Sequence, residues 1–331
     1  KIMKAAVYHR YGPPDVVTLQ DVPRPEPAED EVLVLVAATT VTTADWRLRA
    51  SAFPGGLWLP GRLMMGLFAP RNPVLGGEFA GTVIAKGAKV TEFDIGARVF
   101  GFSGHGAHAE FLTIKANGAI SQIPDGLSET DAAALPFGGI AALVFLRDIA
   151  RIKPGQNILV LGASGNVGVY AVQIAKTMGA QVTAVASDEN HGLLSELGAD
   201  KVIDYRSNDP LSGEIKYDVV LDPAGVSTFK GARKALIPNG VYVALNFSLL
   251  DALRALISRF GGGPTMRIGV NGDTREDVDA LAGMIAKRQV RPVVDRILPL
   301  EQIRDAYAYV EGRHRRGSVV LQVTPTEAEA G

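Results

Sequence analysis

The sequence predicts an α/β protein of two domains, one a β-rich region and the other a doubly wound parallel sheet. Its 331 residues suit about two domains of ordinary size. Short runs of strand-forming residues, broken by Gly and Pro, dominate up to about residue 130. Beyond that point strand patterns alternate with helical patterns, which is typical of a parallel sheet covered by helices on both faces.

The β-rich region contains five segments of strand-forming composition, with turn residues between or beside them. Helical patterns are few, so we expect a compact all-β fold there. The predicted strands are Met3–Tyr8, Glu31–Thr40, Gly81–Ala85, Arg98–Phe100 and Glu110–Lys115.

Residues 53–73 interrupt this region with large apolar side chains among glycines and prolines, Trp58 and Phe68 among them. One interpretation is a hydrophobic loop or short helix that packs on the core. The other is a lid over an apolar pocket, which would suit a hydrophobic or aromatic ligand. The composition leaves both interpretations open.

The second region begins with a helical segment and then alternates. Residues 276–288 predict a later helix, and Pro292–Val323 returns to a strand, a helix and a strand. We therefore assign residues 1–131 and 272–331 to the first domain and residues 132–271 to the second, and we expect the polar tail 324–331 to fray. The alternating segments are the helices Ser128–Asp148, Val167–Met178, Asn190–Leu197 and one ending at Leu236, and the strands Asn157–Leu161, Gln181–Ala186, Lys201–Asp204, Tyr217–Asp222, Gly240–Leu245 and Met266–Val270.

Composition excludes several classes of function. The chain has no cysteine, which excludes disulfides, thiol nucleophiles, Fe–S clusters and cysteine-based zinc sites. The net charge of −1 provides no field for binding nucleic acid or an anionic membrane. There is no secretory signal pattern and no apolar stretch long enough to span a membrane. We therefore expect a cytoplasmic protein without a nucleic-acid or membrane partner.

The strongest local motif is the segment Val160–Gly168, which follows a predicted strand and opens a helix. Gly165 lets the backbone approach a pyrophosphate, Gly168 permits close helix–strand packing, and the helix start offers free N–H groups. The first glycine of the usual dinucleotide pattern is replaced by Ala163, with Gly162 just before it. In this strand–turn–helix context the motif predicts a dinucleotide site that includes Ser164, Gly165, Asn166, Val167 and Gly168.

The end of the next strand bears on the cofactor. Asp188 lies twenty residues after Gly168, where an acid would hold the ribose 2′-hydroxyl of NAD. Alternatively, Asp188 and Glu189 begin the next helix, where acids suit the helix dipole. Ser187 is placed to donate to a 2′-phosphate instead. These residues by themselves leave the choice between NAD and NADP open.

With these motifs in place, the chain resembles the medium-chain dehydrogenase/reductase superfamily, and more narrowly its zinc-independent quinone oxidoreductase branch. The resemblance covers residues 3–323 and is highly specific. The matching segments are Lys4–Val7, Tyr11–Val16, Pro73–Val83, Gly106–Phe111, Ala171–Lys176, Leu197–Asp200, Val202–Tyr205 and Gly317–Leu321.

The resemblance implies a GroES-like β domain joined to a Rossmann domain, with the active site in the cleft between them. It implies NADPH-dependent reduction of quinones or of the C=C bond of α,β-unsaturated carbonyls by hydride transfer, acting on a small hydrophobic carbonyl or quinone substrate. It further implies a homodimer through the edge strand of the Rossmann sheet, here Met266–Val270.

The resemblance also bears on metal binding. The three catalytic zinc ligands of the zinc-dependent relatives align with Thr42, Gly77 and Phe137, and none of these is a competent ligand in that role. Glu78 keeps the acidic position beside the lost ligand. The four-cysteine structural zinc loop is absent, so we expect no zinc.

Cofactor and catalytic roles carry over unevenly. Tyr205 and Arg313 match the residues that hold the 2′-phosphate in NADPH-using relatives, whereas Asn190 replaces a usual Lys. Asp188 and Glu189 beside it would repel a phosphate, and on balance NADPH is favoured over NADH. Asn246 stands where relatives often have Gly, facing the nicotinamide or the substrate.

No general acid is evident. A Tyr that donates a proton in some enoyl reductases aligns near Phe53, and a Thr near the nicotinamide aligns with Ala141. Thr42 either hydrogen-bonds a substrate oxygen or fills the vacated metal pocket, and Asp45 either orients substrate or caps a turn. His105 and His108 either pack or relay protons.

Two other functions stay open: a zinc-free alcohol or carbonyl reductase, and a non-catalytic scaffold that binds nicotinamide. Hydride transfer depends mainly on positioning and carbonyl polarisation, so a site without a strong acid is compatible with quinones and activated enones.

Overall fold

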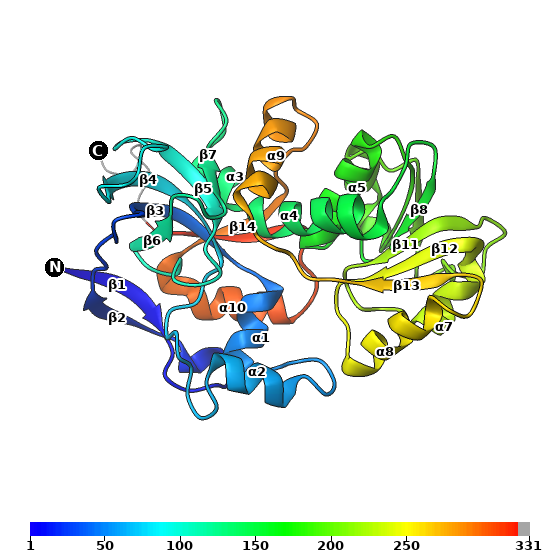
Figure 1. The fold of residues 1–331 in the computed structure, drawn as a ribbon, viewed down its shortest axis with the longest axis horizontal. Coiled ribbons are helices and arrows are strands. Elements are labelled where there is room, and N and C mark those ends of the chain that lie inside the picture. The colour runs from blue at the N-terminus through cyan, green and yellow to red at the C-terminus, as the bar shows by residue number, and fades with distance from the viewer. Residues whose placement is uncertain (324–331) are drawn as a thin grey trace. The chain divides into compact units, whose positions relative to one another are not determined.

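The computed structural model describes residues 1–323, and the expected frayed tail 324–331 lies outside the described residues. The chain divides into two compact units. Unit 1 comprises residues 1–53, 58–137 and the segment from 273 onward, and unit 2 comprises residues 54–57 and 138–272. The α/β class is confirmed, with a mixed, largely antiparallel sheet in unit 1 and a parallel sheet in unit 2 (Figure 1).

Unit 1 is built on a seven-stranded sheet whose long strand β3 (Glu31–Val41) pairs with three neighbours. Its order is β14-β15-β3-β4-β5-β7, and β6 also pairs with β3. Strands β3 and β4 both contribute buried side chains to one core, among them Val34, Val36 and Phe79. The other strands are β4 (Glu78–Lys86), β5 (Arg98–Phe102), β6 (Phe111–Lys115), β7 (Ile120–Gln122), β14 (Val294–Pro299) and β15 (Ser318–Gln322).

Two strands escaped the sequence prediction. Strand β2 (Thr18–Pro23) pairs antiparallel with β1 (Ile2–Val7), and β7 is three residues long. Neither β2 nor β7 has the clear two-residue hydrophobic alternation of an isolated strand, because β2 has no buried residue and β7 is very short.

Five helices belong to unit 1 by their positions in the chain: α1 (Thr43–Ala50), α2 (Trp58–Met65), α3 (Glu129–Ala133), α9 (Arg275–Ala286) and α10 (Ile303–Glu311). Within residues 53–73, α2 is the short helix of the first interpretation, and the ring of Phe53 packs on its Gly61. Its large apolar side chains are nevertheless exposed rather than packed on the core, with Phe68 just beyond it 89% exposed. A lid role stays a prediction.

Unit 2 has six strands, all parallel, in the order β10-β9-β8-β11-β12-β13. The chain starts at β8, winds outward through β9 and β10, and then returns to the other side through β11. The order therefore reverses between β8 and β11, and parallel sheets bind ligands at the carboxyl ends of strands at such a switch point. The strands are β8 (Asn157–Val160), β9 (Gln181–Ala186), β10 (Lys201–Asp204), β11 (Tyr217–Asp222), β12 (Leu236–Ala244) and β13 (Thr265–Ile268).

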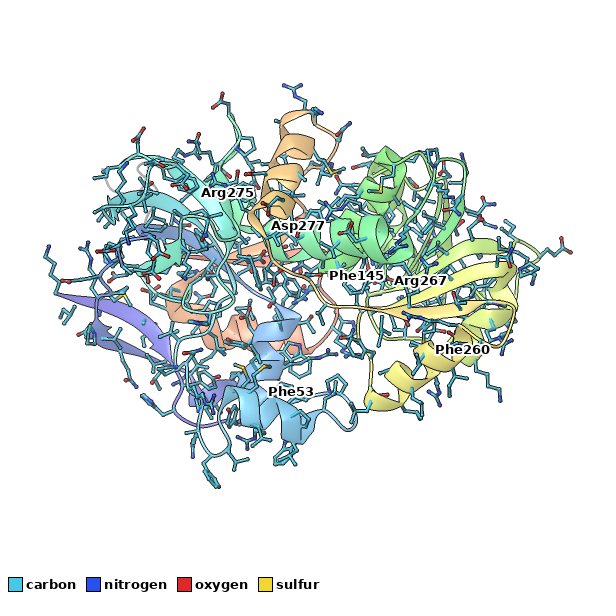
Figure 2. The ribbon with its side chains drawn as sticks, in the orientation of Figure 1. Phe53, Phe145, Phe260, Arg267, Arg275 and Asp277 are labelled. Carbon is cyan, nitrogen blue, oxygen red and sulfur yellow. The ribbon has the colours of Figure 1, made fainter. Side chains whose placement is uncertain are left out.

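The helices predicted from Ser128 onward depart from the structure in three places. The predicted Ser128–Asp148 helix is broken into α3, α4 (Pro136–Val144) and a π-helix over Phe145–Ala150. The helix predicted to end at Leu236 consists of α7 (Phe229–Ala232) and a following 3-10 turn over Arg233–Ala235, and Leu236 already begins β12. Helix α8 (Leu249–Ser258) was missed, and its apolar residues are largely exposed, as is Phe260 beyond it (Figure 2). The remaining helices are α5 (Asn166–Thr177) and α6 (His191–Glu196).

The first domain boundary lies later than the sequence indicated, at residues 137 and 138 instead of 131 and 132. Two contacts explain the shift: the Ser318 hydroxyl donates to the carbonyl of Ala134 (2.9 Å), and the Phe137 N–H donates to the Glu78 carboxylate (2.7 Å). Residues 54–57 belong with unit 2, since Gly56 lies against Leu249 of α8. Among the described residues, no helix is long and apolar enough to cross a membrane.

Candidate functional site

The predicted dinucleotide turn lies at the carboxyl end of β8 and opens α5. Gly165 is the N-cap of α5, and its backbone is extended (φ −72°). No side chain caps this helix start, and its first turn has no acidic residue. The N–H groups at the start of α5, from Asn166, Val167 and Gly168, therefore form an uncapped, positive helix terminus suited to a phosphate.

Two glycines make this turn sterically possible. A Cβ on Gly168 would lie 2.4 Å from the carbonyl oxygen of Gly162 and 2.7 Å from Ala163 backbone atoms. Gly162 has a positive φ of 58°, and a Cβ there would lie 2.6 Å from the Cβ of Ala224. Glycine is thus required at both positions: at Gly168 because α5 approaches the turn closely, and at Gly162 because of its positive φ and the nearby side chain of Ala224. Gly165, by contrast, has room for a methyl group.

The end of β9 brings Ser187 and Asn190 together. The Asn190 amide donates to the Ser187 hydroxyl (2.9 Å), and both side chains are buried. The other Asn190 side-chain atom, Oδ1, is buried without a hydrogen-bond partner among the described residues. An orphaned buried acceptor fits a donor such as a ribose hydroxyl. Asp188 next to them is exposed.

The two acids that would repel a 2′-phosphate differ in their surroundings. Glu189 forms an ion pair with Arg206 (3.2 Å), and hydrogen bonding from Ser187 together with the charge of Arg206 holds its pKa below the usual value. Arg206 also contacts the ring of Tyr205, which is exposed at the end of β10. Sequence reasoning did not identify Arg206, although its position next to Tyr205 was the available signal.

Arg313, the second predicted phosphate ligand, belongs to unit 1. It is exposed, has a positive φ of 58°, and lies close enough to Arg47 for their like charges to lower the pKa of Arg47, after the larger effect of burial. Its role toward a 2′-phosphate stays a prediction.

Asn246 follows β12, and its amide donates to the carbonyl of Pro223 (3.0 Å). The loop it contacts is organised by Asp222, a residue that sequence reasoning missed. The buried Asp222 carboxylate accepts the backbone N–H groups of Gly225, Val226 and Ser227 at 2.8–3.1 Å. An Asp at a strand end before Pro-Ala-Gly was the signal for such a turn. Since unit 2 is parallel, the ends of β8, β9, β10, β11 and β12 share one edge, and the predicted cofactor residues of this unit gather there.

In unit 1 the predicted catalytic residues Thr42 and Asp45 form the capping box of α1. The Thr42 hydroxyl donates to the Asp45 carboxylate (2.7 Å) and accepts the Asp45 N–H (3.1 Å). Asp45 also accepts the N–H groups of Thr42 (2.8 Å) and Gly76 (3.1 Å). Both side chains are buried. Asp45 therefore makes the capping contact, and the hydroxyl proton of Thr42 is already used in a hydrogen bond to the Asp45 carboxylate.

Glu78 is fully buried and accepts hydrogen bonds from the Thr40 hydroxyl and the Phe137 N–H. Burial raises the pKa of its carboxyl to about 8, against the opposing effect of these hydrogen bonds. The nearby charge of Asp45 raises the pKa further, and the charge of Arg315 lowers it. Glu78 is therefore largely protonated at neutral pH.

The residues at the positions aligned with zinc ligands make other contacts in this structure. A Cβ on Gly77 would lie 2.6 Å from the ring of Phe102, whose centroid is 6.2 Å from that of Phe137. The ring of Phe102 thus fills the space beside Gly77, Phe137 offers only an aromatic ring, and Thr42 is engaged in its capping box, so these positions do not fit a zinc ion. Throughout residues 1–323 there is no group of three His, Cys, Asp or Glu side chains arranged to hold a metal.

The two loop histidines differ. His105 is exposed, whereas His108 is buried, with its Nε2 2.8 Å from the carbonyl oxygen of Thr40. The ring edge of His108 faces Tyr307, whose other neighbour is the buried guanidinium of Arg49, 4.8 Å from the ring centroid. Burial lowers the pKa of His108 and raises that of Tyr307. These groups form a packed network, which favours the packing interpretation for His108.

Comparisons with known proteins agree with this architecture. Residues 28–125 match the family model of the alcohol dehydrogenase GroES-like domain, and residues 197–321 match that of the zinc-binding dehydrogenases. A quinone oxidoreductase of Pseudomonas aeruginosa is 30% identical over 342 residues, covering 96% of this chain and 99% of the relative.

Solved structures show the same similarity. The quinone oxidoreductase of Coxiella burnetii has a TM-score of 0.86 at 28% identity, covering 98% of this chain and all of that chain. A mycobacterial protein solved in complex with NADPH has a TM-score of 0.81 at 26% identity, covering 97% of this chain and all of that chain. The chain therefore belongs to the quinone-oxidoreductase-like branch of the medium-chain dehydrogenase/reductase superfamily, and it is an oxidoreductase with a GroES-like domain and a Rossmann domain that uses a nicotinamide cofactor.

Proposed function

We propose that this chain is a zinc-independent reductase of quinones or of the C=C bond of α,β-unsaturated carbonyls, with NADPH favoured over NADH. The observation that carries the proposal is the uncapped start of α5 at the switch point of a parallel sheet, combined with the absence of competent zinc ligands at Thr42, Gly77 and Phe137.

The residues fit a dinucleotide. The backbone of Ser164–Gly168 would hold the pyrophosphate, and the free Oδ1 of Asn190 suits a ribose hydroxyl. When bound, the nicotinamide supplies the hydride for the reduction. Tyr205 and Arg206 support the preference for a 2′-phosphate, because Arg206 offers a cation beside an aromatic ring at the end of β10. The ion pair between Glu189 and Arg206 opposes this preference, because it competes with a phosphate for the Arg206 guanidinium.

The chain's own contribution to the chemistry is positioning. Thr42 and Asp45 hold the segment at Gly76 through the Asp45–Gly76 hydrogen bond. Glu78 retains its proton and is buried, so it adds no negative charge at neutral pH. With the hydroxyl of Thr42 committed, we assign the proton that follows the hydride to water. Quinones and activated enones suit such a site because they accept hydride without a strong acid.

The experiment is a substrate panel with purified protein and either NADPH or NADH. The panel contains a naphthoquinone, a short enone, a simple ketone, and an alcohol with the oxidised cofactor. Turnover of the quinone or enone is expected. Turnover of the ketone or alcohol alone would favour the zinc-free alcohol or carbonyl reductase, and tight cofactor binding without turnover would favour a non-catalytic scaffold.

A homodimer through the edge strand is part of the proposal. Strand β13 ends the sheet and pairs only with β12 among the described strands, although it stops at Ile268 rather than at Val270. A second copy can extend the sheet there. Light scattering after gel filtration is expected to give the mass of two chains, and an Ile268→Pro variant to give one. A monomeric wild type would exclude the dimer.

A further inference from the structure

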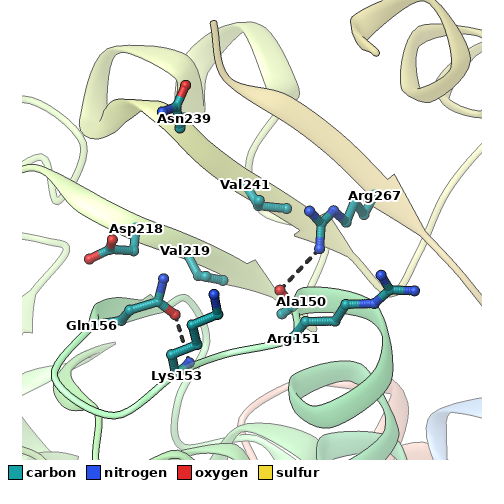
Figure 3. Close-up of a pocket in the computed structure, with 9 residues that line it drawn as sticks. All are labelled: Ala150, Arg151, Lys153, Gln156, Asp218, Val219, Asn239, Val241 and Arg267. Carbon is teal, nitrogen blue, oxygen red and sulfur yellow. Dashed lines mark hydrogen bonds between the residues drawn. The ribbon is translucent and has the colours of Figure 1, made fainter.

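Unit 2 has a cavity of about 270 Å³ away from the dinucleotide turn (Figure 3). Its apolar part is formed by Ala150, Val219 and Val241, which are all buried. Two amide side chains, Gln156 and Asn239, add hydrogen-bonding groups. The cavity therefore offers an apolar surface next to polar groups, as ligand sites commonly do.

Positive charge dominates this cavity. Arg151, Lys153 and Arg267 line it, against the single carboxylate of Asp218. That carboxylate already accepts the N–H of Asn157 (2.8 Å). Within the described part of the chain, the Lys153 ammonium has no hydrogen-bond or ion-pair partner. Three cations against one engaged carboxylate leave the cavity with a formal excess of two positive charges.

The cations are held close together by the backbone. Arg267 of β13 donates to the carbonyl of Ile149 (2.8 Å). It also donates to the carbonyl of Ala150 (3.1 Å) at the end of the π-helix (Figure 3). Arg151 follows directly, with a positive φ of 56°. After the effect of burial, the charges of Arg151 and Arg259 lower the pKa of Arg267, so these cations repel one another. A bound anion would relieve this repulsion.

The position of the cavity separates it from the cofactor turn. Lys153 and Gln156 precede β8, and Asp218 and Val219 lie near the start of β11. The dinucleotide residues lie at the opposite, carboxyl ends of the same strands. From Val219 to the end of β11 at Asp222 the strand advances about 10 Å, so one ligand head group does not serve both places.

We propose that this cavity is a binding site for a small organic phosphate, a molecule with a dianionic phosphate head and an apolar or aromatic body. The head group would lie among Arg151, Lys153 and Arg267, and the body against Val219 and Val241. Cations in a partly enclosed site favour the doubly charged phosphate over neutral ligands.

Phenyl phosphate is the probe for this site, with inorganic phosphate and phenol as matched controls for its two halves. Isothermal titration calorimetry of the full chain at low salt, with and without saturating NADPH, is expected to show phenyl phosphate binding with a Kd on the order of 1 mM. Binding that disappears in NADPH would place the probe on the dinucleotide turn and overturn the proposal. Binding of inorganic phosphate or phenol as tight as that of phenyl phosphate would also overturn it.

Variants of Lys153 localise the binding, because its side chain is exposed and unpaired and we expect its replacement to leave the fold intact. Lys153→Gln is expected to raise the Kd for phenyl phosphate about fivefold, and Lys153→Glu is expected to abolish its binding. The control is Lys201→Gln, which removes an exposed cation at the start of β10 in the same unit. Equal affinities of the wild type and Lys153→Glu, or no saturable binding up to about 20 mM, would refute the proposal.

Discussion

The close approach of α5 to the turn after β8 can be tested with one methyl group. In Gly168→Ala, the new Cβ would lie 2.4 Å from the Gly162 carbonyl oxygen and 2.7 Å from Ala163 backbone atoms. A carbon and an oxygen normally approach no closer than about 3.3 Å, so the helix and the turn must separate by about 1 Å. Both opposing groups are backbone, so no flexible side chain absorbs the overlap. Such overpacking costs about 1–3 kcal/mol of unfolding free energy.

The same displacement moves the N–H groups at the helix start, so the variant is expected to bind NADPH at least about tenfold more weakly, or 1.4 kcal/mol. Urea unfolding measures stability, and cofactor fluorescence measures affinity. Two glycines provide controls. Gly165→Ala adds a methyl with only an ordinary contact of 3.4 Å, so it is expected to lose cofactor affinity while losing at most about 1 kcal/mol of stability as an N-cap.

Gly192→Ala lies in α6 with no atom within 4 Å of the new methyl, and it is expected to raise stability by about 0.5–1 kcal/mol without changing affinity. If Gly168→Ala unfolds at the wild-type urea concentration and binds NADPH as the wild type does, the packing argument is wrong. Unchanged affinity in Gly165→Ala would remove the start of α5 as the phosphate site.

Four further predictions concern other groups. Because burial raises the folded-state pKa of Glu78 to about 8, the stability contributed by its protonated form is complete below the unfolded pKa and is lost as the pH rises through about 8. Urea unfolding between pH 5 and 9 should therefore show the wild type losing up to about 4 kcal/mol of unfolding free energy relative to Glu78→Gln, and parallel pH profiles would contradict this. Thr42→Ala should lose about 1 kcal/mol of stability through its capping box while kcat/KM changes less than about threefold, and a large loss of kcat in a stable variant would instead place the hydroxyl on the substrate. Arg206→Gln should weaken the binding of NADPH about threefold and leave the binding of NADH unchanged. Glu189→Gln should tighten the binding of NADPH, because Glu189 pairs with Arg206. Equal effects on the affinities of both cofactors would exclude Arg206 as a phosphate ligand. Metal analysis of the purified enzyme should find no stoichiometric zinc and chelators should leave turnover unchanged, whereas one zinc per chain would overturn the zinc-independent mechanism.

Much of the fold was predictable because its signals are local. The strands and helices of unit 2 show their hydrophobic patterns within short segments of sequence. The glycines around Gly165 indicate a tight turn, because the conformation of such a turn depends only on neighbouring residues. The strand over 266–270 was also identified, with its end misplaced by two residues. Strand β2 was missed because its residues do not alternate between apolar and polar, and none of them is buried. Helix α8 was missed although the signal was local: Leu249, Leu253 and Leu256 recur at helical spacing after the capping Ser248.

The candidate site divides in the same way. Sequence by itself predicted the dinucleotide turn, because that prediction depends on local glycine spacing, and the resemblance to the superfamily identified Thr42, Gly77 and Phe137 as the positions of the zinc ligands. Only the tertiary structure decided what Asp45 and Glu78 do. Gly76, thirty-one residues away in the chain, donates to Asp45, and Phe137, fifty-nine residues away, donates to Glu78. Burial by such distant segments sets hydrogen-bond partners and pKa values, and no local pattern encodes which segments will meet.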